Sequence, residues 1–285
     1  MKDSNLQIPS IDFGGSGEVI HFLHANGYPP ACYLPLFNEL KNNYHVISIL
    51  SRPLWRDSTP EGMKDWHGFS DDYLQFISQH PSEPVLAVGH SMGGIIALRA
   101  AIKQPEKFRG LVLIDPVLFH PFQILLRRFL ITTGLVYRFH PLIKTTRFRR
   151  RQFTDLEKVF QGFRGKPVFR YFDDANLKAY VEGIVVPNPG GGFLLEYSPE
   201  WEMEIYATGV WNDLDLWRNL SRLQVPLLVI RGDETDTFMM KSFKLLQKRL
   251  PDAKILNLSN ATHLVPLEKP GEVGQAIIQF AQEML

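Results

Sequence analysis

The chain has 285 residues, of which 45% are hydrophobic and 21% charged, a composition typical of a soluble globular protein with a sizeable core. The net charge of +1 excludes a polyelectrolyte that binds partners through its overall charge, and a single cysteine, Cys32, excludes an intrachain disulfide. No apolar run approaches the roughly 20 residues that span a bilayer, and residues 1–15 lack the apolar segment of a secretory signal. We therefore expect a cytoplasmic protein.

Short, continuously apolar segments alternate with helical patterns along the chain. Continuous apolar character predicts strands that are buried on both faces, and the helical patterns between them predict an α/β fold with a mostly parallel sheet. The predicted strands are 18–25, 45–50, 84–91, 110–116, 225–233 and 253–259, and the predicted helices include 92–105, 239–251 and 271–285.

The alternation stops between residues 118 and 210, which predicts an insertion over the sheet, with a turn at 188–192 (NPGGG). Residues 118–180 contain thirteen Lys and Arg against four Asp and Glu, whereas the rest of the chain has 18 basic and 26 acidic residues. This asymmetry has two interpretations: a solvated helical face, or a surface that attracts an anionic substrate or an anionic membrane. No nucleic-acid-binding module accompanies the basic residues, so we expect no nucleic-acid partner.

Residues 89–93 (GHSMG) match the pattern G-x-S-x-G between a predicted strand and a predicted helix. A sharp strand-to-helix turn projects the central serine above the sheet edge, and small residues must flank the serine for the backbone to turn so tightly. The following helix directs its N–H groups toward the same point. This context predicts that Ser91 is a nucleophile.

A serine nucleophile needs a histidine base, and the histidine needs a carboxylate that orients it. Of the nine histidines, only His263 follows both Ser91 and the late predicted strands. Three acids, Asp233, Glu234 and Asp236, follow the strand 225–233 in the stretch RGDETD. A metal site is disfavoured there, because no histidine is near and the spacing differs from a calcium-binding loop. We find no motif for a nucleotide or flavin and expect no cofactor.

The stretches LHANG, GHSMGG, RGDETD and ATHLVPLEKP together resemble the α/β-hydrolase superfamily, in the right order and over nearly the whole chain. The resemblance implies a mostly parallel eight-stranded sheet with helices on both faces and a helical cap inserted after the sixth strand. The hydrolase core would then comprise 1–117 and 211–285, and the cap would comprise 118–210. A serine at position 91 differs from haloalkane dehalogenases and soluble epoxide hydrolases, which carry an aspartate there.

The same resemblance implies further site residues. Relatives usually place the catalytic acid three or four residues after the glycine of the RGDETD stretch; the third position is Thr235, so we expect Asp236, with Asp233 as the runner-up. Two main-chain N–H groups, of Met92 and Asn26, are expected to form the oxyanion hole. Because LHANG departs from the usual His-Gly pair, Gly27 and Tyr28 remain alternatives to Asn26.

These residues predict a serine hydrolase that cleaves an ester through an acyl-enzyme at Ser91, similar to a carboxylesterase or a lysophospholipase. If the basic insertion is more than a solvated helical face, it suggests an anionic acyl ester and a weak contact with a membrane surface. Alternatives are a receptor-like protein of this fold with little turnover, and a C–C bond hydrolase or thioesterase. An adhesive role through the Arg-Gly-Asp tripeptide has the least support. The sequence leaves the oligomeric state open.

Overall fold

A computed structural model describes residues 7–80, 84–209 and 211–284. The predicted core and insertion boundaries include residues 1–6, 81–83, 210 and 285, which lie outside the described residues.

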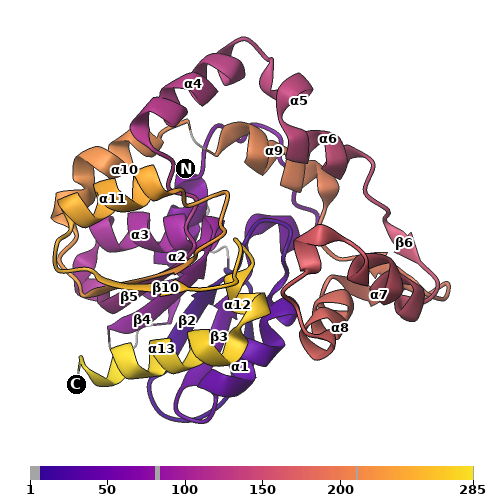
Figure 1. Ribbon diagram of the computed structural model, residues 1–285, viewed down its shortest axis with the longest axis horizontal. Coiled ribbons are helices and arrows are strands. Elements are labelled where there is room, and N and C mark those ends of the chain that lie inside the picture. Colours follow the sequence, from indigo (N-terminus) through magenta and orange to yellow (C-terminus); the bar gives the residue numbers. More distant parts are fainter. Residues whose placement is uncertain (1–6, 81–83, 210, 285) are drawn as a thin grey trace.

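The main sheet of the described chain has seven strands in the order β1-β3-β2-β4-β5-β9-β10 (Figure 1). All neighbouring strands pair in parallel except β1, which is antiparallel to β3. The strands are β1 (Ser10–Gly14), β2 (Val19–Leu23), β3 (His45–Ile49), β4 (Val85–His90), β5 (Phe108–Ile114), β9 (Leu227–Gly232) and β10 (Lys254–Leu258). The mostly parallel sheet is confirmed. The described residues contribute seven strands to it, one fewer than the eight expected. The sequence of β1 gave no signal, since this edge strand is largely exposed.

Helices cover both faces of the sheet. Successive side chains of β5 explain why its sequence is continuously apolar: Leu111 and Leu113 join one hydrophobic cluster, and Val112 and Ile114 join the other. The first cluster includes side chains of α2 (His67–Gln79), α3 (Met92–Lys103), α10 (Asp213–Asn219) and α11 (Met240–Arg249). The second includes α1 (Leu34–Leu40), α12 (Val265–Glu268) and α13 (Pro270–Gln282). Short 3₁₀ helices lie at Pro30–Tyr33, Arg52–Leu54, Pro105–Lys107, Pro167–Phe169 and Leu220–Arg222.

The segment between β5 and α10 is helical with one small sheet. Its helices are α4 (Pro121–Thr132), α5 (Val136–Phe139), α6 (Pro141–Arg147), α7 (Leu156–Arg164), α8 (Asp174–Gly183) and α9 (Pro199–Thr208). The strands β6 (Gln152–Phe153), β7 (Val185–Pro187) and β8 (Phe193–Leu195) form an antiparallel sheet in the order β6-β8-β7, which the sequence did not predict. The predicted turn at 188–192 connects β7 to β8 and is closed by the Asn188 N–H, which donates to the Gly192 carbonyl at 2.9 Å. The division into a core and a cap at the predicted boundaries stays a prediction.

The carboxyl ends of β4, β5 and β9 lie next to one another at one edge of the sheet. His90 pairs with Ile114, and Ile114 pairs with Ile230, so the residues that follow these positions leave the sheet side by side. Loops at such an edge are where ligands bind in open α/β sheets. Among the helices that the structure describes, none is long and apolar enough to cross a membrane.

Candidate active site

Ser91 occupies the sharp turn between β4 and α3. Its backbone has φ 56° and ψ −115°, a conformation that costs free energy for any residue with a side chain. A Cβ atom on Gly89 would lie 2.4 Å from the Gly93 carbonyl oxygen, and a Cβ atom on Gly93 would lie 2.0 Å from the Leu23 carbonyl oxygen. Both flanking positions therefore require glycine, which gives the G-x-S-x-G pattern its physical basis here.

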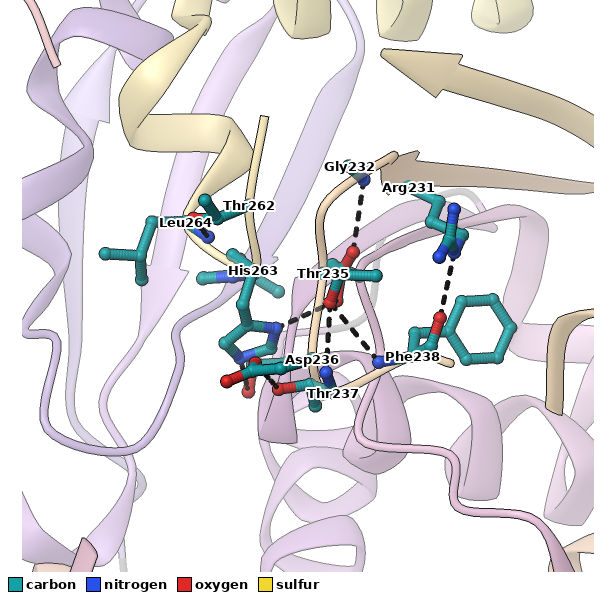
Figure 2. Close-up of polar contacts among 12 residues, drawn as sticks. Arg231, Gly232, Thr235, Asp236, Thr237, Phe238, Thr262, His263 and Leu264 are labelled. Atoms are coloured by element: carbon teal, nitrogen blue, oxygen red, sulfur yellow. Dashed lines mark hydrogen bonds and ion pairs between the residues drawn. The ribbon is translucent and has the colours of Figure 1, made fainter. Parts of the chain in front are cut away.

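His263 lies between Ser91 and a carboxylate. Its Nε2 is 2.9 Å from Ser91 Oγ, and its Nδ1 is 2.9 Å from Asp115 Oδ1 (Figure 2). Because a carboxylate only accepts hydrogen bonds, Nδ1 carries the proton and Nε2 is left free to accept the serine proton. The structure thus brings together the predicted Ser91 and His263 in the geometry of a nucleophile and its base.

The expectation that Asp236 accepts the Nδ1–H of His263 is wrong. Asp236 is exposed and accepts a hydrogen bond from the Thr237 hydroxyl at 3.1 Å (Figure 2). The runner-up Asp233 is also exposed and accepts the Ala261 N–H at 3.3 Å. The residue of this loop that points inward is Thr235, which is buried. Neither the Asp233 nor the Asp236 carboxylate is the hydrogen-bond partner of His263 Nδ1, which pairs with Asp115.

Asp115 takes the place that the sequence prediction gave to the loop after β9. It follows directly on β5, is fully buried, and donates its own N–H to the Ile230 carbonyl at 2.8 Å. Its carboxylate accepts from the Thr235 hydroxyl at 2.6 Å and from the Gly232 N–H at 3.2 Å (Figure 2). The sequence placed Asp115 at the end of the predicted strand 110–116, but only the strand order of the fold shows that this strand lies next to that of Ser91.

The remaining residues of the RGDETD stretch have structural contacts. Arg231 is only 5% exposed and its Nε donates to the Phe238 carbonyl at 2.9 Å, so the Arg-Gly-Asp tripeptide is not displayed on the surface. Glu234 accepts hydrogen bonds from Arg170 and Tyr171, which precede α8. The stretch therefore supports Asp115 and contacts the inserted segment without supplying the carboxylate itself.

The loop that carries His263 is held from two sides. The Glu268 carboxylate accepts the Thr262 N–H at 2.7 Å and the Thr262 hydroxyl at 2.6 Å. Burial raises the pKa of Glu268. On the other side, His90 Nε2 lies 2.8 Å from the His263 carbonyl oxygen. These contacts fix the main chain on either side of the imidazole.

His90 also connects this loop to the turn after β2. Its Nε2 must carry the proton, because the carbonyl of His263 can only accept, so its Nδ1 accepts from the Tyr33 hydroxyl at 2.7 Å. The Tyr33 oxygen in turn accepts the Ala25 N–H at 3.2 Å. Burial holds the pKa of His90 well below its ordinary value, consistent with the neutral ring that this chain of hydrogen bonds requires.

The turn after β2 holds the predicted oxyanion residue Asn26. Its side chain is fixed by α9 and the segment before it: Nδ2 donates to the Glu202 carbonyl at 3.1 Å, and Oδ1 accepts from the Tyr197 hydroxyl at 3.0 Å. The Tyr28 N–H donates to the Ala25 carbonyl at 3.3 Å, whereas the Asn26 N–H has no hydrogen-bond acceptor within the part of the chain described. The N–H of Met92, the first residue of α3, belongs to a helix start, where N–H groups lack partners in the helix.

A buried carboxylate of α9 packs against the same turn. Glu202 is 1% exposed, lies 3.0 Å from Arg149, and accepts hydrogen bonds from the hydroxyls of Thr146 and Tyr206. Burial raises the pKa of Glu202, while the Arg149 charge opposes that shift. A Cβ atom on Gly27 would lie 3.0 Å from the carboxyl carbon of Glu202. The inserted segment thus fixes the shape of the predicted oxyanion turn.

No group of three or more His, Cys, Asp or Glu side chains is placed to hold a metal ion in the ranges that the structure describes. The side chains at the edge of the sheet are instead arranged for proton transfer between a hydroxyl, an imidazole and a carboxylate.

Comparison with known proteins places this arrangement in a family. Residues 22–276 match the family model described as the alpha/beta hydrolase family. The chain belongs to the alpha/beta hydrolase family. As a member of that family it shares the fold that the sequence resemblance implied, with a serine on the turn between β4 and α3.

Several alpha/beta hydrolases are similar to this chain at low identity. A 2-(acetamidomethylene)succinate hydrolase of Mesorhizobium japonicum is 24% identical over 267 residues, which cover 93% of this chain and 88% of the relative. A probable alcohol acetyltransferase of Cyberlindnera fabianii is 24% identical over 226 residues, which cover 75% of this chain and 57% of the relative. The crystal structure of an E-2-(acetamidomethylene)succinate hydrolase superposes on this chain with a TM-score of 0.75 at 21% identity. The superposition covers 96% of this chain and 94% of the hydrolase chain.

Proposed function

We propose that this alpha/beta hydrolase is a serine hydrolase that cleaves an ester through an acyl-enzyme at Ser91. The observation that carries the proposal is the chain of hydrogen bonds from Ser91 through His263 to Asp115, with both distances at 2.9 Å. Such a chain increases the nucleophilicity of a hydroxyl that is unreactive alone at neutral pH.

The geometry supports a two-step reaction. His263 Nε2 takes the Ser91 proton as Oγ attacks the ester carbonyl, and the Asp115 carboxylate stabilises the imidazolium that forms. The N–H groups of Met92 and Asn26 would receive the negative charge on the former carbonyl oxygen. His263 then gives its proton to the leaving alcohol and later takes a proton from water, which attacks the acyl-enzyme and releases the acid.

The relatives support acyl chemistry and leave its acceptor open. One is named for the hydrolysis of an acetamido compound and another for the transfer of an acetyl group to an alcohol. An acyl-serine intermediate serves both outcomes, because either water or an alcohol can remove the acyl group. The complete Ser–His–Asp chain favours catalysis over a receptor-like role, since a ligand sensor has no need of an oriented base.

A fluorophosphonate probe tests the proposal, because it labels a serine only when a neighbouring base activates the hydroxyl. We expect labelling of the wild type, and loss of labelling in Ser91→Ala and His263→Ala. Ser259→Ala is the matched control, since this exposed serine lies in the loop that leads to His263. A folded wild-type protein that resists the probe would overturn the proposal.

A panel of p-nitrophenyl esters then identifies the acyl group. Turnover of esters by the wild type, with a burst of p-nitrophenol when the acyl-enzyme accumulates, is the expected result. Parallel assays with a thioester and with an added alcohol distinguish ester hydrolysis from thioester cleavage and from acyl transfer. A protein that labels with the probe and cleaves none of the esters would remove the ester substrate and keep the activated serine.

A further inference from the structure

The outer face of α4 is apolar although it is exposed. Phe122, Leu125, Leu126 and Phe129 follow the spacing i, i+3, i+4, i+7, which places them on one side of the helix. Their side chains are 71%, 55%, 55% and 59% exposed, whereas Ile124 of the same helix is fully buried. Phe122 and its neighbours therefore form a solvent-facing apolar stripe that is left uncovered by the residues that the structure describes.

The apolar surface continues along α5 and α6. Figure 1 shows α4, α5 and α6 as an arch at the top of the view, on the outer edge of the molecule. The arch and the residue after it expose four more large side chains: Tyr137, Phe139, Leu142 and Phe148. Eight of the fourteen exposed large hydrophobic side chains in the described residues thus lie between positions 122 and 148. An exposed apolar surface of this density indicates a binding surface.

The same stretch has a single sign of charge. From Pro116 to Thr154 the sequence contains eight Lys and Arg and no Asp or Glu. Five of these cations have contacts within the molecule: Arg127, Arg128 and Arg138 lie over aromatic rings, the last over its neighbour Phe139, and Arg149 and Arg151 pair with glutamates of α9. Four of the eight are exposed and have no ion-pair partner among the residues described here: Arg138, Lys144, Arg147 and Arg150.

We propose that the arch from α4 to α6 docks on the surface of an anionic lipid bilayer. The apolar stripe would enter the boundary between headgroups and acyl chains, and the four unpaired cations would contact anionic headgroups, as in helices that lie in the membrane interface. A second copy of this chain fits less well, because two surfaces that carry only positive charge repel each other. The proposal does not depend on the chemistry of Ser91.

Co-sedimentation with vesicles tests the docking. The full chain is mixed with vesicles of phosphatidylcholine alone or of phosphatidylcholine mixed with phosphatidylglycerol. We expect the protein to pellet with the anionic vesicles, with partitioning that falls as salt increases and is at least about tenfold weaker on the neutral vesicles. Ser91→Ala should pellet as the wild type does, which separates docking from catalysis. Equal partitioning on both kinds of vesicle, or none on either, overturns the proposal.

Two pairs of variants locate the surface. Phe122→Ser with Phe129→Ser should weaken binding to anionic vesicles by about tenfold or more, because both rings are exposed and would enter the lipid. The matched control is Leu34→Ser with Val168→Ser, which removes exposed apolar side chains elsewhere and should leave binding unchanged. If the two pairs bind alike, the docking surface is not α4.

Charge is tested in the same way. The preference for anionic vesicles should be abolished by Lys144→Glu with Arg147→Glu, on α6. The matched control is Lys244→Glu with Lys248→Glu on α11, which makes the same change in net charge and should retain the preference. Sedimentation velocity without lipid tests the alternative that a second copy of this chain covers the surface. A wild-type dimer that Phe122→Ser with Phe129→Ser converts to a monomer, without vesicle binding by either protein, would assign the surface to self-association and overturn the lipid proposal.

Discussion

Replacement of Asp115 by asparagine tests the assignment of the catalytic carboxylate most directly. In the wild type, Oδ1 accepts from His263 and Thr235, and Oδ2 accepts from Gly232. An amide has only one acceptor oxygen. If that oxygen stays with His263, the NH₂ group faces the Gly232 N–H; if the amide turns, its NH₂ group faces His263 and moves the imidazole proton to Nε2, opposite Ser91.

The size of the effect follows from the same geometry. In the proposed reaction, His263 would become a cation while its Nδ1 stays 2.9 Å from Asp115 Oδ1. With an effective dielectric constant of about 20, unit charges about 4 Å apart attract by about 4 kcal/mol, which corresponds to a change of about a thousandfold in rate. We therefore expect Asp115→Asn to lower kcat by about 10³-fold, and the wrong imidazole tautomer can only increase that loss.

The assay is ester hydrolysis under saturating substrate, with the rate of fluorophosphonate labelling as a second measure. Asp236→Asn is the matched control, because this exposed aspartate makes the same chemical change in the neighbouring loop, and its kcat should stay within about threefold of the wild type. Thermal unfolding shows whether Asp115→Asn remains folded. A folded Asp115→Asn protein with a kcat close to that of the wild type would refute the reasoning, as would a larger loss in Asp236→Asn.

A second substitution on top of the first sharpens this test. Thr235 points inward and its hydroxyl is 2.6 Å from Asp115 Oδ1, at the third position after Gly232. Thr235→Asp combined with Asp115→Asn should therefore recover at least about tenfold of the lost kcat, because it returns a carboxylate to the neighbourhood of His263. Asp236 and Asp233 are hydrogen-bonded to Thr237 and Ala261 in the wild type, so neither is expected to replace the lost carboxylate in the single variant Asp115→Asn.

Three further predictions follow from contacts around the site. Tyr33→Phe should lower kcat by about tenfold with little change in KM, and it should reduce thermal stability. The substitution leaves the buried Ala25 N–H and the Nδ1 of His90 without partners. An unchanged kcat would show that the hydrogen-bond chain does not position the site. Gly27→Ala should cost about 1–3 kcal/mol of unfolding free energy, measured in urea, since φ is +80° and the new Cβ would meet Glu202. The pKa of His21 is lowered by burial to about 4, so its contribution to stability is present above pH 6.5 and is lost as pH falls toward 4. Between pH 6.5 and pH 4, His21→Phe should therefore lose about 3 kcal/mol less unfolding free energy than the wild type loses. Equal losses in both proteins would contradict this prediction.

Local sequence patterns predicted the sheet and the sharp turn at Ser91 because each depends on neighbouring residues. Six of the seven strands of the main sheet lie in segments that are continuously apolar, and Gly89 and Gly93 are required by contacts within a few ångströms of the turn. The edge strand β1 and the small sheet of the inserted segment had no such signal, since β1 is largely exposed and the strands β6 to β8 have two or three residues each.

The carboxylate could not be predicted in the same way, because its position depends on which strands are neighbours. Asp115 and Asp236 both follow strands that end at the same edge of the sheet, and both lie between Ser91 and His263 in the chain, so chain order does not separate them. The direction of each side chain decides between them. The side chain of Thr235 is buried, whereas that of Asp236, one position later, is exposed. A resemblance that allows either the third or the fourth position after a glycine cannot make that distinction.

The position of Asp115 also affects how the enzyme could be divided. The proposed nucleophile and acid stand at the ends of adjacent strands, β4 and β5, whereas His263 arrives from the last part of the chain, after an exposed turn at Pro251 and Asp252. A cut at that turn would leave two of the three groups in one fragment and the base, with β10 and α13, in the other. The proposed ester cleavage would then return only when the fragments reassociate, so two fused partner proteins could be detected by the hydrolysis that their binding restores.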